Sequence, residues 1–218
     1  LSLRAMVRAH CLARMGERAA AARALAAAEA ALVPVPAVAV AVGGLPGVGK
    51  STLARTLAPG LGAAPGALVL RSDEIRKRRF GMPPEQRLPE AAYAEPVSRE
   101  VMAGLCRATG EAVALGHSVV ADATFLDPAD RAAIAQAVPG PAPFLGVWLR
   151  APLAVLEARI AARRGDASDA TIEVLRRAAA AWPGEAAGRG PADWLAVPAT
   201  DAATAAAQVR CRLAGKSC

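Results

Sequence analysis

The sequence predicts an α/β fold of three layers, in which a parallel five-stranded sheet carries helices on both faces. Five short apolar segments alternate along the chain with segments of helical pattern. One of these segments leads into a glycine-rich loop that is followed by a helix. The chain has 218 residues, 54% of them hydrophobic, which suits one such domain with a short appendage.

The N-terminal part reads as the appendage. Residues 2–32 are rich in alanine with arginines interspersed, and they predict one or two helices. Pro34 and Pro36 then break the pattern. We therefore expect a helical segment over residues 1–36, followed by the α/β domain over residues 37–218. Because the chain begins at Leu1, the first segment could be the tail of another domain.

The first half of the domain follows in order. Residues 37–42 are a β-branched run that ends in glycine, and they predict a buried strand. A helix is expected at 50–57 and a second strand at 67–70. A basic helix at 74–79 and a loop at 81–89 come next.

The second half repeats the alternation. The segment 90–115 is mostly helical, although Pro96 interrupts or starts part of it. Pro128 suits the first position of a helix after Asp127. Strands are expected at 118–121, 144–149 and 193–197, and helices at 128–138, 152–163, 169–181 and 202–213.

The glycine-rich loop matches the pattern G-x-x-x-x-G-K-[ST] without a gap. Its glycines allow backbone angles that turn successive N–H groups toward one anion, and the next helix adds its positive end. We expect Lys50 to contact the β- and γ-phosphates of ATP, Ser51 to ligate Mg²⁺, and Thr52 to reach the α-phosphate. The predicted nucleotide contacts are Gly44, Leu45, Pro46, Gly47, Val48, Gly49, Lys50, Ser51 and Thr52. This pattern predicts a P-loop NTPase fold.

Two acidic residues stand where strands end, the edge at which open α/β sheets bind ligands. Asp122 follows an apolar strand and is expected to hold Mg²⁺ opposite Ser51. The alternative is that it caps a turn at 123–124. Asp73 follows another strand and is expected to take the proton from an attacking hydroxyl. The alternative is that Ser72 or Asp73 caps the next helix.

Basic residues form two groups. Arg159, Arg163 and Arg164 precede a short loop with Gly165, and they predict a lid that stabilises charge during phosphoryl transfer, with Arg163 catalytic. A solvated helix end is the alternative. Residues 76–79 form a basic cluster that either binds an anionic acceptor or is a solvated face. Arg131 is a weaker phosphate candidate, and Tyr93 and Arg87 are candidates for shaping the acceptor pocket.

Charge and composition set limits on function. The net charge of +7 suits anionic ligands without choosing among them. The four cysteines include no C-x-x-C pair, so neither a zinc site nor a disulfide framework is expected, which fits a cytoplasmic protein. No segment reaches the ~18 apolar residues of a membrane span. Aromatic residues make up only 3%, too few for a stacking platform for single-stranded nucleic acid.

Four stretches carry a family resemblance: VGGLPGVGKST (42–52), LRSDEIRKRR (70–79), VVADATFL (119–126) and WLRAPLAVLEARIAARRGDASD (148–169). They resemble the bacterial AAA-family ATP-binding domains that are often fused behind an aminoglycoside-phosphotransferase-like domain. That P-loop kinase group is similar to polynucleotide 5′-hydroxyl kinases, zeta-type toxins and gluconate kinases. The likeness covers about 38–199.

The resemblance implies ATP as nucleotide, Asp73 as base, Asp122 on the metal side and the Arg163 region as lid. The fusion partner's His-Gly-Asp stretch is absent from the sequence, so aminoglycoside phosphorylation is not expected of this chain. We expect transfer of the γ-phosphate of ATP to a hydroxyl of an unidentified acceptor. The alternatives are a regulatory ATPase module of a larger fusion protein, or a polynucleotide 5′-hydroxyl kinase. Nucleic acid is not the favoured partner.

Overall fold

The computed structural model describes residues 1–162, 169–182 and 190–215. Five parallel strands form one sheet: β1 (Ala39–Gly43), β2 (Leu68–Arg71), β3 (Val119–Asp122), β4 (Phe144–Arg150) and β5 (Leu195–Pro198). Their order in space is β2-β3-β1-β4-β5. The predicted parallel five-stranded sheet is therefore confirmed.

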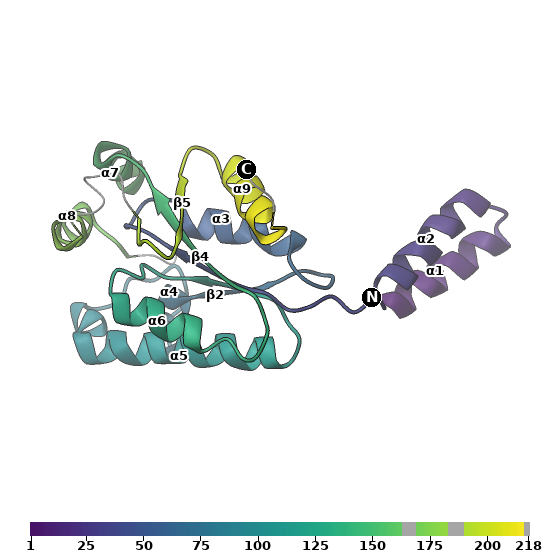
Figure 1. The fold of residues 1–218 in the computed structure, drawn as a ribbon, viewed down its shortest axis with the longest axis horizontal. Coiled ribbons are helices and arrows are strands. Elements are labelled where there is room, and N and C mark those ends of the chain that lie inside the picture. Colours follow the sequence, from purple (N-terminus) through teal and green to yellow (C-terminus); the bar gives the residue numbers. More distant parts are fainter. Residues whose placement is uncertain (163–168, 183–189, 216–218) are drawn as a thin grey trace.

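Helices cover both faces of the sheet (Figure 1). One face carries α3 (Lys50–Leu57) and α9 (Ala202–Leu213), and the other carries α4 (Ser72–Arg79), α5 (Glu95–Ala114) and α6 (Pro128–Gln136). The helices α7 (Leu153–Ala162) and α8 (Ile172–Ala181) lie beyond the edge where the strands end. Two 3₁₀ turns, η1 (Ala58–Gly60) and η2 (Glu90–Tyr93), complete the connections. The three-layer α/β prediction is confirmed.

Some boundaries differ from the sequence prediction. The segment expected as one helix over 90–115 is the short turn η2 followed by α5, because Pro96 fits only the first turn of an α-helix. The helix expected from residue 169 begins at Ile172, where the hydroxyl of Thr171 accepts a hydrogen bond from Val174 N (3.3 Å). Asp127 caps α6 before Pro128, as expected.

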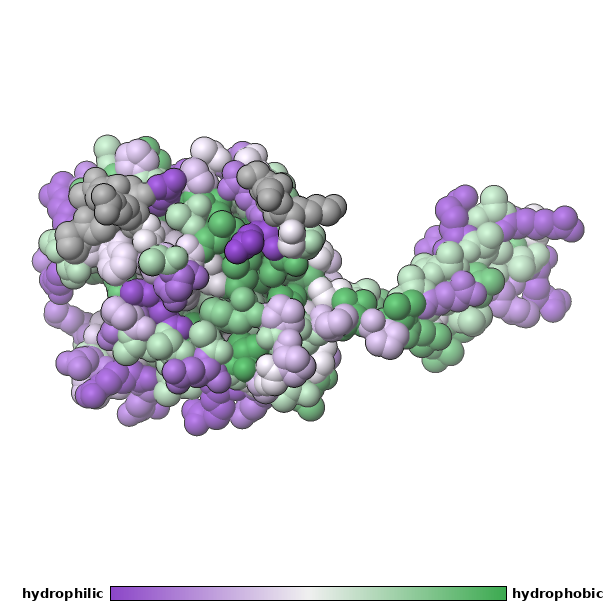
Figure 2. Space-filling model, viewed as in Figure 1, coloured by the Kyte–Doolittle hydropathy of each residue, from purple (hydrophilic) through white to green (hydrophobic). Residues whose placement is uncertain are grey.

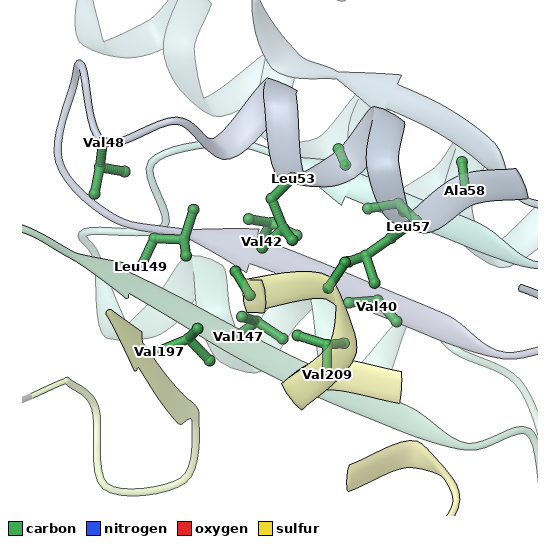
Figure 3. Packing of buried hydrophobic residues seen from close by; sticks show 14 of the residues in the cluster. Val40, Val42, Val48, Leu53, Leu57, Ala58, Val147, Leu149, Val197 and Val209 are labelled. Carbon is green, nitrogen blue, oxygen red and sulfur yellow. The ribbon is translucent and has the colours of Figure 1, made fainter. Parts of the chain in front are cut away.

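The alternation along β1 sorts the core into two faces. Val40 and Val42 face α3 and α9, where they pack in a cluster with Leu57 and Val209 (Figure 3). Ala41 faces the opposite side and packs with residues of α5 and α6, such as Leu105. Both faces of the central strand are fully buried, as expected for a parallel sheet.

The second face has an aromatic core that composition did not predict. Trp148 and Trp194 are buried there, with ring centroids 6.4 Å apart. Their neighbour on β4, Gly146, leaves the necessary space, because a Cβ at that position would lie 2.4 Å from Trp194. Although aromatic residues make up only 3% of the chain, two of its tryptophans lie together on this face of the sheet.

The N-terminal residues form two helices, α1 (Ser2–Arg14) and α2 (Arg18–Ala30), joined by a turn at Gly16. This helical pair extends away from the sheet (Figure 1). Apolar residues are visible along it and at its junction with the sheet domain (Figure 2), and Leu1, Leu3 and Val7 are exposed. The pair packs mainly on itself through small residues such as Ala28.

Two global features complete the fold. Within the described ranges, no helix combines the length and the apolar character that a membrane span requires. Among the described residues, Cys11 and Cys106 are free thiols.

Candidate active site

The glycine-rich loop (residues 44–51) connects the central strand β1 to α3. Three of its glycines have positive φ: 134° at Gly44, 83° at Gly47 and 101° at Gly49. A Cβ at Gly44 would also lie 2.5 Å from the carbonyl oxygen of Leu149. These are angles that other residues rarely adopt, so the glycines are required for the path of this loop. Such a path makes a concave site for an anion.

Lys50 begins α3 and closes the loop. Its ammonium donates hydrogen bonds to the carbonyl oxygens of Gly44 and Leu45, both at 3.0 Å. The cation therefore lies against the loop whose N–H groups would bind phosphate. A phosphate bound there would meet both the lysine charge and the N-terminal end of α3.

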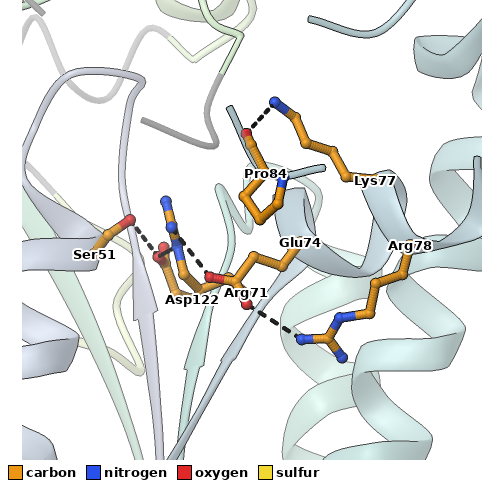
Figure 4. Close-up of polar contacts among 7 residues, drawn as sticks. All are labelled: Ser51, Arg71, Glu74, Lys77, Arg78, Pro84 and Asp122. Carbon is orange, nitrogen blue, oxygen red and sulfur yellow. Dashed lines mark hydrogen bonds and ion pairs between the residues drawn. The ribbon is translucent and has the colours of Figure 1, made fainter. Parts of the chain in front are cut away.

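Ser51 and Asp122 meet at the same edge of the sheet. The hydroxyl of Ser51 donates to Oδ2 of Asp122 at 2.5 Å (Figure 4). The register explains the meeting, because Asp122 at the end of β3 stands beside Val42 of β1, just before the loop. Asp122 is only 4% exposed. Hydroxyl and carboxylate oxygens are of the type that Mg²⁺ prefers as ligands.

Arg71 is a site residue that sequence reasoning missed. It ends β2 directly beside Asp122, and its Nε lies 3.3 Å from Oδ2 of that carboxylate. Its guanidinium also pairs with Glu74 at 3.2 Å, and Arg71 is 5% exposed (Figure 4). A buried arginine at a strand end was the available signal, but only the register of β2 and β3 shows which carboxylate it meets.

Asp73 lies in the first turn of α4 and faces the same site. Burial raises the pKa of its carboxyl, and the nearby charge of Asp122 raises it further, while Lys50, Arg71 and Arg76 act in the opposite direction. The helix begins at Ser72 with Arg71 at the N-cap and no side-chain capping bond. Capping by Ser72 or Asp73, the alternative considered from sequence, is therefore not what the structure has.

One cleft of about 1160 Å³ joins these groups. The glycine-rich loop forms one wall, and α4 with the segment 87–94 forms another. Polar residues from both walls line it: Lys50, Ser51, Thr52, Ser72, Asp73, Arg76, Arg87, Tyr93 and Asp122. Arg87 and Tyr93, the candidates for shaping the pocket, both line this cleft.

A second pocket of about 640 Å³ lies on the other side of the loop. Gly47, Val48, Gly49 and Thr52 line it, together with Arg159 and the turn after β5. Arg159 donates to the carbonyls of Val48 (3.2 Å) and Ala199 (3.0 Å), so it links that turn to the glycine-rich loop. Arg163 and Arg164, the other predicted lid arginines, lie outside the described residues.

The basic cluster at 76–79 divides into different environments. Arg76 lines the cleft, with its guanidinium 4.8 Å from the ring centroid of Tyr93. Lys77 is buried at 1% exposure, whereas Arg78 and Arg79 are exposed and pair with Glu74 and Glu100. Neither alternative from sequence describes the whole cluster. Arg131 is also buried, and it donates to the carbonyls of Phe125 and Leu126.

The parallel sheet with a glycine-rich loop after its central strand defines a protein of the P-loop fold class. A family model described as "AAA domain" matches residues 39–183, which is more than half of the chain. The chain therefore belongs to this AAA domain family.

Curated relatives are longer than this chain. Uncharacterized proteins of Mycobacterium tuberculosis (Rv2004c) and Mycobacterium bovis (Mb2027c) are 34% identical to it over 146 residues. The match covers 64% of this chain but only 28% of each relative. The matched part of the chain thus spans little more than a quarter of the length of these proteins.

Solved structures share the fold. A gluconokinase from Sinorhizobium meliloti is 22% identical with a TM-score of 0.50, covering 85% of this chain and 100% of that one. A sugar kinase from Janibacter sp. is 16% identical with a TM-score of 0.53, covering 84% and 96%. A shikimate kinase from Acinetobacter baumannii is 15% identical with a TM-score of 0.54, covering 82% and 94%. At these identities the likeness concerns the fold alone.

Proposed function

We propose that this chain transfers the γ-phosphate of ATP, with Mg²⁺, to a hydroxyl group of a small acceptor. The observation that carries this proposal is the placement of Asp73, on α4, in the same cleft as the glycine-rich loop. A bare nucleotide site needs the loop, Lys50, Ser51 and Asp122. A carboxylate facing them from α4 is what a hydroxyl acceptor would require.

The nucleotide side of the proposal rests on the loop. Its N–H groups and Lys50 would hold the β- and γ-phosphates, while Thr52 would approach the α-phosphate. Ser51 and Asp122 fit Mg²⁺ because both offer oxygen, and Mg²⁺ bound with a nucleotide takes its remaining ligands from phosphates and water. The described residues contain no group of three or more His, Cys, Asp or Glu that would form an all-protein cage instead. Bound there, the metal would neutralise charge on the phosphates.

The acceptor side rests on Asp73. Its carboxylate would accept the proton of the acceptor hydroxyl as the hydroxyl oxygen forms its bond to the γ-phosphorus. The bond from the γ-phosphorus to the bridging oxygen breaks, and ADP leaves with that electron pair. A raised pKa suits this role because it makes Asp73 a stronger base than an ordinary aspartate.

Arginines would stabilise the charge that spreads over the transferred group. We assign this role to Arg163, with Arg159 and Arg164 as further contacts of the nucleotide. Arg159 already lies beside the glycine-rich loop through its bond to Val48. The use of ATP would place the reaction in the cytoplasm.

The test is transfer from γ-labelled ATP with Mg²⁺ to a panel of acceptors. The panel contains gluconate, shikimate, neutral sugars and a 5′-hydroxyl oligonucleotide, since the fold is shared with kinases of the first three kinds. We expect labelled product from a small-molecule acceptor, and none with Lys50→Met, whose loss removes the cation at the loop.

Other results would redirect the assignment. Label transferred only to the oligonucleotide would favour a polynucleotide 5′-hydroxyl kinase. Nucleotide binding with slow hydrolysis and no labelled acceptor would favour a regulatory ATPase module of a longer protein that also carries an N-terminal phosphotransferase-like domain.

A further inference from the structure

One carboxylate joins three separate parts of the cleft. Asp169 lies just before α8, and its side chain is 7% exposed. Oδ2 accepts hydrogen bonds from the amide of Leu88 (2.9 Å) and the hydroxyl of Tyr93 (2.7 Å). Oδ1 lies 3.2 Å from the ammonium of Lys77. The donors are 76 to 92 residues away along the chain, so these contacts are tertiary.

Lys77, which pairs with Asp169, is itself buried. It belongs to α4, the helix that carries Asp73, and only 1% of its side chain is exposed. Its ammonium also donates to the carbonyl of Pro84 at 2.6 Å (Figure 4). A buried ammonium requires a compensating charge, and Asp169 supplies it. The segment 84–93 is therefore fastened to α4 and to Asp169 at the same point.

Tyr93 extends the link toward the proposed base. Its ring lies against the guanidinium of Arg76, which in turn donates to the carbonyl of Ala92 (2.6 Å) and to Ser98 (3.2 Å). Tyr93 and Arg76 both line the cleft beside Asp73. A displacement of Asp169 would release Tyr93 and the backbone at Leu88, and with them this wall of the cleft.

From these contacts we infer that Asp169 is a positioning residue that holds residues 84–93 as the acceptor-binding wall. The role of Asp169 rests on the proposed function, because only a transferase has an acceptor to bind. Asp169 need not touch either substrate. Its loss should weaken acceptor binding more than nucleotide binding, since the glycine-rich loop makes none of these contacts.

Electrostatics keep the carboxylate in the form that this role needs. Partial burial raises the pKa of Asp169, but the hydrogen bonds from Leu88, Tyr93 and Lys77, together with the lysine charge, lower it overall. Asp169 is therefore ionised at neutral pH and can accept from all three donors at once.

The first measurement needs no acceptor. Tyr93 is the single tyrosine of the chain, so tyrosine labelled with carbon-13 at Cζ gives one resonance. We expect its chemical shift to change in Asp169→Asn, because the hydroxyl loses its charged acceptor. Glu157→Gln is the matched control, because it likewise removes one carboxylate charge. Glu157 accepts a hydrogen bond from Arg176 of α8, and it lines neither pocket. An unchanged resonance in Asp169→Asn would overturn the inference.

The second measurement separates positioning from chemistry, with the panel member that wild-type protein phosphorylates fastest. In Asp169→Asn we expect the acceptor KM to rise at least ~tenfold, because a charged hydrogen-bond network is lost. The ATP KM should stay unchanged, and kcat should change much less than the acceptor KM. Equal loss of all three parameters, or no change in acceptor KM, would overturn the inference. If no acceptor is phosphorylated, the proposed function fails. The tyrosine resonance still shows whether Asp169 contacts the hydroxyl of Tyr93.

A folding defect has its own control. Asp169→Asn leaves the buried Lys77 without its counter-charge, so the variant Lys77→Met/Asp169→Asn removes both charges together. We expect this double variant to fold and to keep the raised acceptor KM. A wild-type acceptor KM in the folded double variant would contradict the role of Asp169.

Discussion

At the scale of single residues, Asp73 and Asp122 both lie where a strand ends, but their environments differ. Asp122 accepts hydrogen bonds from Ser51 and Arg71. Asp73 has a raised pKa because of burial and the neighbouring charge of Asp122. Groups whose environments differ in this way are suited to different tasks, here metal binding and proton abstraction.

The raised pKa of Asp73 predicts the pH dependence of transfer. Only the ionised carboxylate can accept a proton, so the rate should be full above the raised pKa and fall as the pH drops through it. The acid limb of kcat should therefore lie at higher pH than the ~3.9 of an unperturbed aspartate. A rate profile measured in buffers of constant ionic strength checks this, and a rate that stays constant down to about pH 4 would contradict it.

Ser51 gives a second prediction at this scale. Ser51→Ala should raise the Mg²⁺ concentration for half-maximal transfer roughly tenfold, because one oxygen next to Asp122 is lost. Removal of metal with a chelator should abolish transfer in both proteins. Thr56→Val is the control, since that hydroxyl donates to the carbonyl of Thr52 within α3 and Thr56 lines neither pocket. An equal Mg²⁺ requirement in wild type and Ser51→Ala would exclude the serine as a ligand.

At the scale of elements, the strand register determines which side chains meet. β2, β3 and β1 place Arg71, Asp122 and Val42 side by side at one edge of the sheet. The loop after β1 brings Ser51 to the same place. The site is therefore a consequence of the order β2-β3-β1 rather than of any one segment.

This explains what the sequence could and could not predict. Apolar runs and the glycine pattern identified the five strands and the loop, because these depend on neighbouring residues. Asp122 lies 51 residues from Arg71, and the partners of Asp169 lie up to 92 residues away, so no local pattern specifies these contacts. The start of α4 at Ser72 also escaped prediction, since Arg71 caps it without a side-chain hydrogen bond.

The buried ion pair of Arg71 predicts a cost in stability. Arg71→Met should lower the free energy of unfolding by about 3 kcal/mol, because it leaves Asp122 buried without its counter-charge. Arg78→Met should cost less than ~1 kcal/mol, although Arg78 pairs with the same Glu74, because its side chain is 73% exposed. Urea unfolding of both variants measures the difference, and equal costs would refute the explanation.

At the scale of the whole molecule, the helical pair α1–α2 stands apart from the sheet (Figure 1). The buried residues of the sheet core begin at Ala39. The two buried residues of the pair, Ala9 and Ala28, belong to none of these core clusters. The matched relatives are far longer than this chain. We therefore interpret residues 37–218 as the unit that binds nucleotide, and the pair as an extension of it.

Removal of residues 1–36 tests this interpretation. The shortened chain should keep its urea midpoint and its ATP affinity, because none of the cleft residues and none of the sheet core is lost. Fluorescence of the buried Trp148 and Trp194 reports the unfolding. A large drop in the midpoint would show that the helical pair contributes to the stability of the sheet domain.

Asp73→Asn is compared with wild type in two assays, ATP binding and γ-phosphate transfer. We expect ATP affinity to be unchanged, because the contacts proposed for ATP come from the glycine-rich loop, whereas Asp73 lies on α4. Transfer should fall by roughly 10²–10⁴, the contribution of a general base. Transfer that persists in Asp73→Asn at the wild-type rate would contradict the assignment of this cleft as a phosphotransferase site with Asp73 as its base.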